Sequence, residues 1–140
     1  MSQGDLEIKI LSPERILFRG TVKSLGLPGK LGYMTILPGH ASMVAELEPG
    51  IMTYAVDSQA ERFFLAGGFV DVGSEGVTVL ADVVERASEI NVERAKKALD
   101  RAQDRLTGSK ASDVDVPRAL SAKKRAAHRL ELAGAVKTLH

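Results

Sequence analysis

The sequence predicts a β + α fold: an antiparallel β-sandwich over residues 1–86, followed by an antiparallel two-helix hairpin over residues 87–140. Two observations predict this division. As far as Asp82, short β-prone runs alternate with Gly and Pro turn signals at regular spacing, which is typical of a sandwich or barrel. From Ser88 onward, apolar residues recur every three or four positions, which is the period of an amphipathic helix.

The expected strands are short. Over residues 6–10 apolar and charged residues alternate, which predicts a strand with one buried face. The other expected strands cover residues 16–18, 21–27, 33–37, 42–47, 52–56, 62–66, 69–72 and 77–81. The Gly-Ser-Glu-Gly run at 73–76 suits a four-residue hairpin loop. Because no connection has room for a βαβ crossover, a parallel sheet is not expected. Phe69 and Val70 are both expected in the sandwich core.

Two Leu-Pro-Gly triplets, Leu27-Pro28-Gly29 and Leu37-Pro38-Gly39, are the most distinctive feature of this region. Pro presets φ and Gly permits φ > 0, so each triplet is expected to form a type II turn. The stretch carries almost no reactive group, which indicates a role in shape rather than in chemistry.

Two helices are expected after residue 87. The first is capped by Ser88 or Asn91 and ends at residues 107–109; the second follows a linker at 113–115 and has Pro117 in its first turn. Their apolar stripes are Val92, Ala95, Leu99, Ala102 and Leu106, then Ala119, Ala122, Ala126, Leu130 and Ala133. Alanine stripes bury little apolar area, so we expect a hairpin that is held only marginally and can move.

Composition excludes several classes of site. The chain has no Cys, which rules out disulfides, thiolate metal sites and Cys nucleophiles and suits a reducing compartment. The N-terminus does not resemble a signal peptide, and no apolar run is long enough to span a membrane. Residues 1–86 carry 7 Lys and Arg against 11 Asp and Glu, whereas residues 87–140 carry 12 against 7. The basic second region is expected either to meet an acidic partner or to be a solvated helical surface.

Catalytic and metal-binding patterns are missing from the sequence. His40, His128 and His140 lack metal-ligand spacing, and His40 is expected to stabilise a turn rather than to act as a base. Gly67-Gly68 lies between strands, so it does not form the usual phosphate-binding loop. The arginines at 94, 101, 118, 125 and 129 either converge to bind phosphate or form an ordinary ion-paired helix surface. Nucleic-acid binding is not expected, because no aromatic residues accompany them.

Several motifs in a fixed order resemble those of the epsilon subunit of bacterial F-type ATP synthases. They read L-P-G-x-x-G, I-L-P-G-H-A, E-P-G-I-M-T-Y, G-G-F-V-D-V, V-T-V-L-A-D and E-R-A. The match runs from about Leu6 to Leu106. It implies a sandwich of about ten strands, a two-helix hairpin, and a non-catalytic subunit of the central rotor stalk, without a cofactor, that couples proton flow to ATP synthesis.

The resemblance also implies partners. The sandwich is expected to bind the gamma subunit and the c-subunit ring through loops that contain Gly29, Lys30, Gly32, Pro38, Gly39 and His40. Lys30 stands where the family often has an acid. The helices are expected to lie folded or to extend toward the alpha and beta subunits, where they inhibit ATP hydrolysis. The implied location is the cytoplasmic face of the bacterial inner membrane, as a peripheral subunit.

Some members of that family bind ATP in the folded hairpin. The residues at the corresponding positions are Glu85, Ile90, Asn91, Arg94, Ala95, Arg101, Arg125 and Arg129, with Asn91 in place of an aspartate. The amide keeps an acceptor but loses a charge, so we expect weak or absent ATP binding. The alternatives left open are a free-standing nucleotide sensor that uses the arginine hairpin and, more remotely, a small β-sandwich enzyme.

Overall fold

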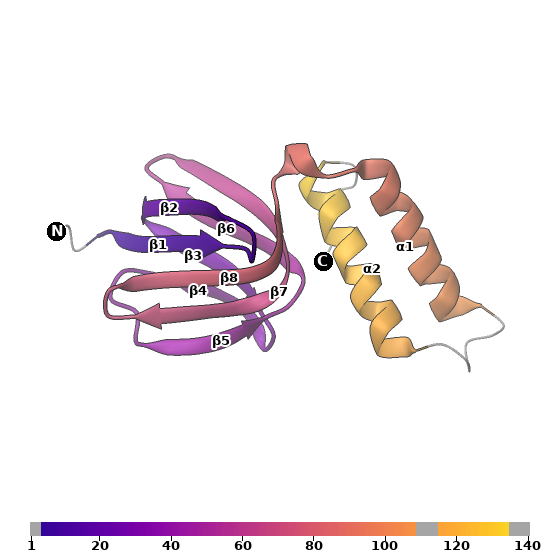
Figure 1. Cartoon of the computed structure of the whole chain (residues 1–140), viewed down its shortest axis with the longest axis horizontal. Coiled ribbons are helices and arrows are strands. Elements are labelled where there is room, and N and C mark those ends of the chain that lie inside the picture. Colours follow the sequence, from indigo (N-terminus) through magenta and orange to yellow (C-terminus); the bar gives the residue numbers. More distant parts are fainter. Residues whose placement is uncertain (1–3, 109–114, 135–140) are drawn as a thin grey trace. The chain divides into compact units, whose positions relative to one another are not determined.

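The protein is described by a computed structural model over residues 4–108 and 115–134 (Figure 1). The chain divides into two compact units, Met1–Val84 and Glu85–His140. The first unit is built of strands and the second of helices, so the predicted fold class, a β-sandwich followed by two helices, is confirmed.

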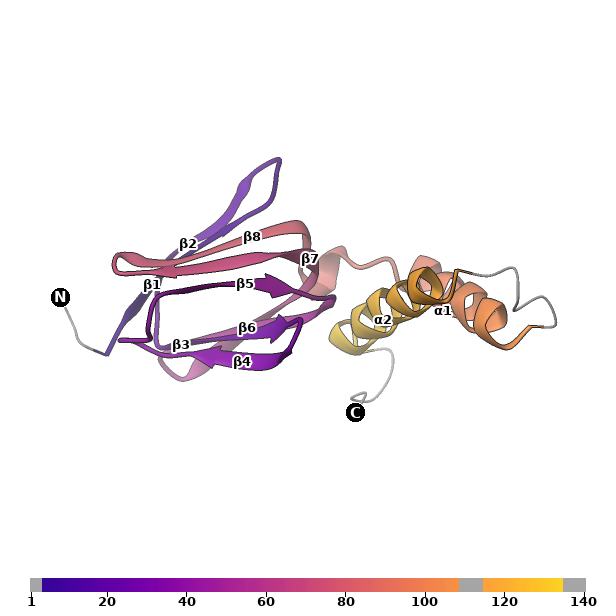
Figure 2. The same ribbon diagram turned by 90° about the horizontal axis from the view of Figure 1, so that it is seen from below.

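Eight strands make up the sheet of the described residues. They are β1 (Leu6–Leu11), β2 (Ile16–Val22), β3 (Ser24–Gly29), β4 (Gly32–Ile36), β5 (Met43–Leu47), β6 (Gly50–Val56), β7 (Gln59–Gly73) and β8 (Gly76–Glu85). Their order is β2-β1-β8-β7-β5-β3-β4, and β6 pairs with β3 and β7. The sheet folds over to form the two layers seen in Figure 2.

The sheet is not a parallel sheet, as expected, but one strand pair in it is parallel. Strand β1 pairs with β8 in parallel, from Ile8 opposite Val77 to Leu11 opposite Leu80. These are the first and last strands, so all the intervening strands serve as the connection between them. A parallel pair needs a long connection between its two strands, and here the rest of the sandwich supplies it.

Strand β7 passes from one layer to the other. Its first half pairs with β6 and its second half with β5, and the change occurs at Gly67 and Gly68. These residues have φ values of 75° and 136°, which residues other than glycine rarely adopt. The strands expected at 62–66 and 69–72 are therefore one bent strand, because the glycines bend the strand without ending it.

The sandwich core is made of large side chains. Those with no exposed surface in this cluster are Ile10, Leu25, Leu27, Ile36, Met52, Leu65, Val70 and Val79. Three rings join β2, β6 and β7, because Tyr54 stacks on Phe18 at 4.6 Å and on Phe63 at 5.8 Å between centroids. Phe69 is 52% exposed, so its expected place in the core is wrong, whereas Val70 is buried as expected. Neighbouring residues of a strand face opposite sides, so only one of the two can point into the core.

The two Leu-Pro-Gly triplets have different structures. Pro38-Gly39 forms the expected turn, with Gly39 at φ 84° and the His40 N–H donating to the Leu37 carbonyl at 3.1 Å. Pro28-Gly29 ends strand β3 instead, and the turn follows at Lys30-Leu31, so the first expected turn is wrong. The pairing of β3 with β4 extends to Gly29 opposite Gly32, which keeps the triplet extended.

Two other boundaries differ from those expected. The strand expected over 21–27 is split at Lys23 between β2 and β3. Gly73 and Gly76 belong to β7 and β8, so the loop between them contains only Ser74 and Glu75 rather than four residues. The second difference arises because the strands continue through Gly73 and Gly76, whose residue type favours turns.

The second unit contains a short helix η1 (Ala87–Glu89), then α1 (Val92–Thr107) and α2 (Val116–Leu132). Asn91, rather than Ser88, caps α1 by accepting the Arg94 N–H at 3.0 Å. Asp115 caps α2 in the same way, accepting the Arg118 N–H at 3.1 Å. The rest of the expected linker, 113–114, lies outside the described residues.

The two helices pack through small side chains. The buried residues of α1 are Ala95 and Ala102, and those of α2 are Ala119, Ala126, Leu130 and Leu132. Val92, Leu99 and Leu106 of the expected stripe are only partly buried. The seam therefore follows the predicted alanine stripes, and only a few large apolar side chains are buried in this unit.

Candidate functional site

A small pocket lies within the helical unit. Its volume is about 250 Å³, and its lining residues are Glu85, Glu89, Asn91, Arg94, Ala95, Ala98 and Arg129. They come from the segment before α1, the first turns of α1 and the last turns of α2. The pocket thus lies where the segment before α1 and the start of α1 meet the C-terminal turns of α2.

An ion pair closes one side of this pocket. Arg129 donates from Nε to Glu85 Oε1 at 2.8 Å and from Nη2 to Oε2 at 3.5 Å. Both side chains are little more than one quarter exposed. This two-point geometry joins residues 44 positions apart in sequence, and it neutralises the Arg129 charge. An incoming phosphate would have to compete with Glu85 for the same guanidinium group.

Asn91 and Arg94 occupy the opening of helix α1. The Asn91 side-chain oxygen is engaged as the helix cap, so its acceptor is already satisfied by backbone. The Arg94 side chain makes no hydrogen bond or ion pair with any other described residue. Arg94 is therefore the cation of this pocket that remains available to a ligand.

The structure brings together only part of the expected nucleotide-binding set. Glu85, Asn91, Arg94 and Arg129 line the pocket, whereas Ile90, Arg101 and Arg125 do not. Arg125 instead donates to the Ser121 hydroxyl at 3.0 Å. Arg118 is exposed at the other end of α2 and does not line the pocket either.

Ala95, which matches the family motif, also lines the pocket, and two further lining residues were not expected. Ala98 lies four residues after Arg94 on the same helix, and helical spacing could have found it. Glu89 could be found only from the geometry of η1, where its carboxylate accepts the Arg86 N–H at 2.9 Å.

The charge and the size of the pocket both limit what it can bind. Glu85 and Glu89 balance the charges of the two pocket arginines, and the pocket volume is below the range of about 300–1,000 Å³ usual for ligand sites. The arrangement suits weak anion binding at most.

Strand β4 and the residues on either side of it expose apolar side chains. Leu31, Tyr33 and Leu37 are 104%, 61% and 54% exposed, around the turn at Lys30-Leu31 and the strand that follows it. Lys30 Nζ lies 3.2 Å from Glu46 Oε2, so the cation is paired within the unit. Exposed leucine and tyrosine side chains along one strand and the turns beside it are typical of a surface that another protein covers.

The histidines show no metal or catalytic arrangement. His40 Nδ1 lies 2.8 Å from the Ala41 carbonyl oxygen, a contact within the loop. His128 Nδ1 lies 4.0 Å from Glu131 Oε1, and His140 is outside the described residues. Across residues 4–108 and 115–134 there is no group of three or more potential metal-binding side chains. In that same part of the chain, every helix is too short or too polar to cross a bilayer.

Comparisons with known proteins point to one family. Residues 5–87 match the family model of the ATP synthase delta/epsilon chain β-sandwich domain, and residues 88–134 match that of its long α-helix domain. The ATP synthase epsilon chain of Desulforudis audaxviator is 43% identical over 137 residues, covering 98% of this chain and 99% of that one. The epsilon chain of Solibacter usitatus is 44% identical over 98 residues, covering 70% and 73%.

A solved structure shows the same fold. A chain in the OSCP/F1/c-ring assembly of the Euglena gracilis mitochondrial ATP synthase has a TM-score of 0.69 and 19% identity. The similarity covers 94% of this chain and 78% of that one.

Proposed function

The chain belongs to the ATP synthase delta/epsilon chain family as an epsilon chain, a non-catalytic subunit, and from this premise we propose that it is a rotor subunit of the central stalk. One observation carries the proposal: the two family models match the sandwich and the helices in order, and a relative is similar over nearly the whole chain. In this role the protein couples proton flow to ATP synthesis without reacting itself.

The sandwich contacts the gamma subunit and the c-subunit ring through its loops. The contact residues are Gly29, Lys30, Gly32, Pro38, Gly39 and His40, as expected from the family resemblance. Support comes from the exposure of Leu31, which has no other described side chain covering it. Because Glu46 neutralises Lys30, this edge presents an apolar tip beside a neutral pair rather than a single acidic side chain.

The loop contact is tested by Leu31→Ser, compared with Val44→Ser. Both side chains are well exposed in the isolated chain, so neither change should alter its stability. We expect Leu31→Ser to reduce co-purification with the gamma subunit and c-ring severalfold, and Val44→Ser to leave it unchanged. Equal recovery of both variants would contradict the loop assignment. Lys30→Glu serves as a further test, since stronger assembly would mean that the ring offers a cation here.

The helices regulate the enzyme by extending toward the alpha and beta subunits and inhibiting ATP hydrolysis. The alanine seam supports this role, because two states exchange readily only when their free energies differ little. The test is ATPase activity of the assembled catalytic head with the full chain or with a chain lacking residues 87–140. We expect higher hydrolysis with the truncated chain; unchanged activity would contradict inhibition.

A second function, nucleotide sensing, is favoured by the pocket that holds Glu85, Asn91, Arg94 and Arg129. Weak or absent ATP binding is expected, because Arg129 is paired with Glu85 and the pocket is small. ATP titration of the wild type is compared with Asn91→Asp, which restores the family carboxylate, and with Arg94→Gln. Micromolar binding by the wild type would overturn the expectation, and binding that Arg94→Gln leaves intact would exclude this pocket.

The proposed location is the cytoplasmic face of the bacterial inner membrane, where the chain is held through its partners. Membrane fractions from cells with and without the gamma subunit test this. The epsilon chain should leave the membrane fraction when gamma is missing.

A further inference from the structure

The outer face of the sandwich carries two cations side by side. Lys9 on β1 and Arg19 on β2 are direct cross-strand partners in an antiparallel pair. Like charges placed opposite each other destabilise a sheet, because their side chains start only about 5 Å apart. This position is therefore unfavourable in the free protein unless something neutralises it.

Neither cation has a direct side-chain partner. Within the described residues, the side chains of Lys9 and Arg19 make no hydrogen bond or ion pair. Two other lysines of the same unit are paired, Lys23 with Asp5 at 2.6 Å and Lys30 with Glu46 at 3.2 Å. Lys9 and Arg19 therefore differ from Lys23 and Lys30, whose charges are paired with carboxylates.

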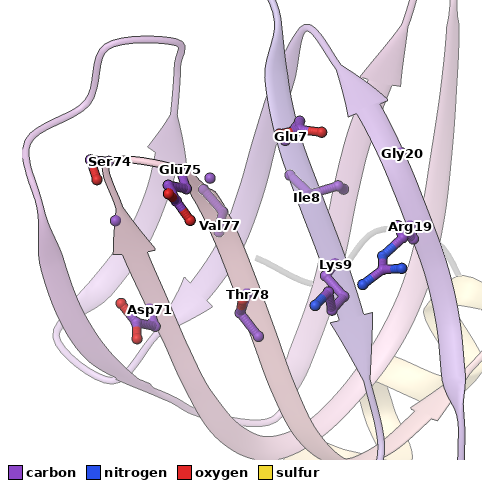
Figure 3. Close-up of a pocket in the computed structure, with 12 residues that line it drawn as sticks. Glu7, Ile8, Lys9, Arg19, Gly20, Asp71, Ser74, Glu75, Val77 and Thr78 are labelled. Carbon is purple, nitrogen blue, oxygen red and sulfur yellow. The ribbon is translucent and has the colours of Figure 1, made fainter.

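The two cations lie in an open depression of about 660 Å³ (Figure 3). Thr78 is the cross-strand partner of Lys9 on its other side, and its hydroxyl adds a neutral donor next to the cations. Figure 3 shows the Arg19 side chain pointing toward Lys9, with Asp71 beyond Thr78. The row across β2, β1 and β8 therefore presents a guanidinium group, an ammonium group and a hydroxyl together.

We propose that Lys9, Arg19 and Thr78 form a binding site for a single phosphate group. A guanidinium fork and an ammonium group are the side chains suited to phosphate oxygens. A bound dianion would remove the repulsion between the two cations. Three acids, Glu7, Asp71 and Glu75, also line the depression, and because their repulsion grows with the charge of the ligand, a single phosphate group is favoured over longer polyanions. Free phosphate and a lipid headgroup both supply this chemistry.

The first test is titration of the isolated full-length chain with inorganic phosphate, followed by NMR of the Lys9 and Arg19 side chains. Chloride at equal ionic strength is the reference. We expect saturable shifts, and Lys9→Gln or Arg19→Gln should weaken binding about tenfold, the effect of losing one charged hydrogen bond. Arg62→Gln is the matched control, because it removes an exposed cation elsewhere in the same unit.

Vesicles separate the two sources of phosphate. Sedimentation with phosphatidylglycerol vesicles, which depends on Lys9 and Arg19 and is absent with phosphatidylcholine, would assign a headgroup. Shifts with inorganic phosphate alone would assign the free ion. No response to either probe, or equal weakening by Arg62→Gln, would overturn the site.

Thermal unfolding supplies a measurement that does not depend on the ligand. Lys9→Gln should raise the unfolding midpoint at low salt and abolish any further increase with phosphate, because it removes the repulsion that phosphate relieves. A midpoint lowered by Lys9→Gln would contradict the proposal. Since these measurements use the isolated chain, a negative result for the phosphate site would leave the rotor assignment unaffected.

Discussion

The two units of this chain bury very different side chains. The sandwich buries aliphatic and aromatic residues and stacks three rings across its layers. The helical unit buries mainly alanines, and Leu130 and Leu132 are its buried large side chains among the described residues. Because stabilisation scales with buried apolar area at about 25 cal/mol per Å², the same length of chain is held much more firmly in the sandwich.

This difference matches the division of work proposed for the protein. A subunit that transmits torque needs a part with a fixed shape, and large interlocking side chains provide it. A part that switches must have two states of similar free energy, and a seam of small side chains can separate at low cost. Four changes would break or sharpen this contrast, in order of decreasing effect.

The largest effect is expected from Phe63→Ala in the sandwich. Phe63 is 1% exposed and stacks on Tyr54, so its removal should cost about 3–5 kcal/mol of unfolding free energy. Phe69→Ala is the matched control on the same strand; it should cost much less, because Phe69 is 52% exposed. Urea unfolding followed by circular dichroism measures both. Similar losses would mean that the ring stack does not hold the sandwich together.

Ala102→Leu tests the seam of the helical unit. A leucine at this buried position overpacks the contact and should cost about 1–3 kcal/mol. Lys96→Leu introduces the same side chain at an exposed position of α1 and should be nearly neutral. Hydrogen exchange should show faster opening of α1 and α2 and unchanged protection of the sandwich. A wild-type hairpin as well protected as the sheet would contradict its marginal stability.

Glu85→Gln probes the contact that joins the two ends of the helical unit. Losing the ion pair with Arg129 should cost about 1 kcal/mol, since the pair is two-point but partly exposed. The exchange of amides near residue 129 reports the change. Asp71→Asn, at an exposed position in the sandwich, is the control. An undisturbed α2 would mean that alanine packing alone holds the helix.

The smallest effect concerns Lys23 at alkaline pH. The hydrogen bond and the charge of Asp5 raise the pKa of Lys23 above 10.5. A raised folded pKa contributes stability that is complete below the unfolded pKa of about 10.4 and is lost as pH rises through the folded pKa. Unfolding midpoints between about pH 9 and 12 should fall slightly more in the wild type than in Lys23→Gln. Parallel curves would show that the pair contributes nothing measurable.

Much of the fold could be predicted because its signals are local. Alternation over residues 6–10 predicted β1, and Asn91 was one of two caps expected for α1. One error arose where a neighbouring strand decides the outcome, since Pro28-Gly29 is extended because β4 pairs along it. No property of the Leu-Pro-Gly triplet alone reports that pairing. The Phe69 error concerned the local pattern, because adjacent residues of a strand face opposite sides and Val70 is the buried one.

The candidate sites divide in the same way. The sequence named Glu85, Asn91, Arg94 and Arg129, and the structure places them in one pocket; their role in binding stays a prediction. The separation of Arg101 and Arg125 from that pocket depends on how α1 and α2 pack. The cross-strand meeting of Lys9 and Arg19 depends on the register of β1 and β2, which the sequence pattern did not reveal.

By itself the sequence determined the fold class and the alanine composition of the seam, since periodicity, caps and turn residues act over a few neighbours. Tertiary structure alone decided that β1 lies parallel to β8, that Glu85 pairs with Arg129, and that Lys9 faces Arg19. The physical reason is range: strand register and ion pairs join residues far apart in the chain, and only the packed backbone brings them within a few ångströms of each other.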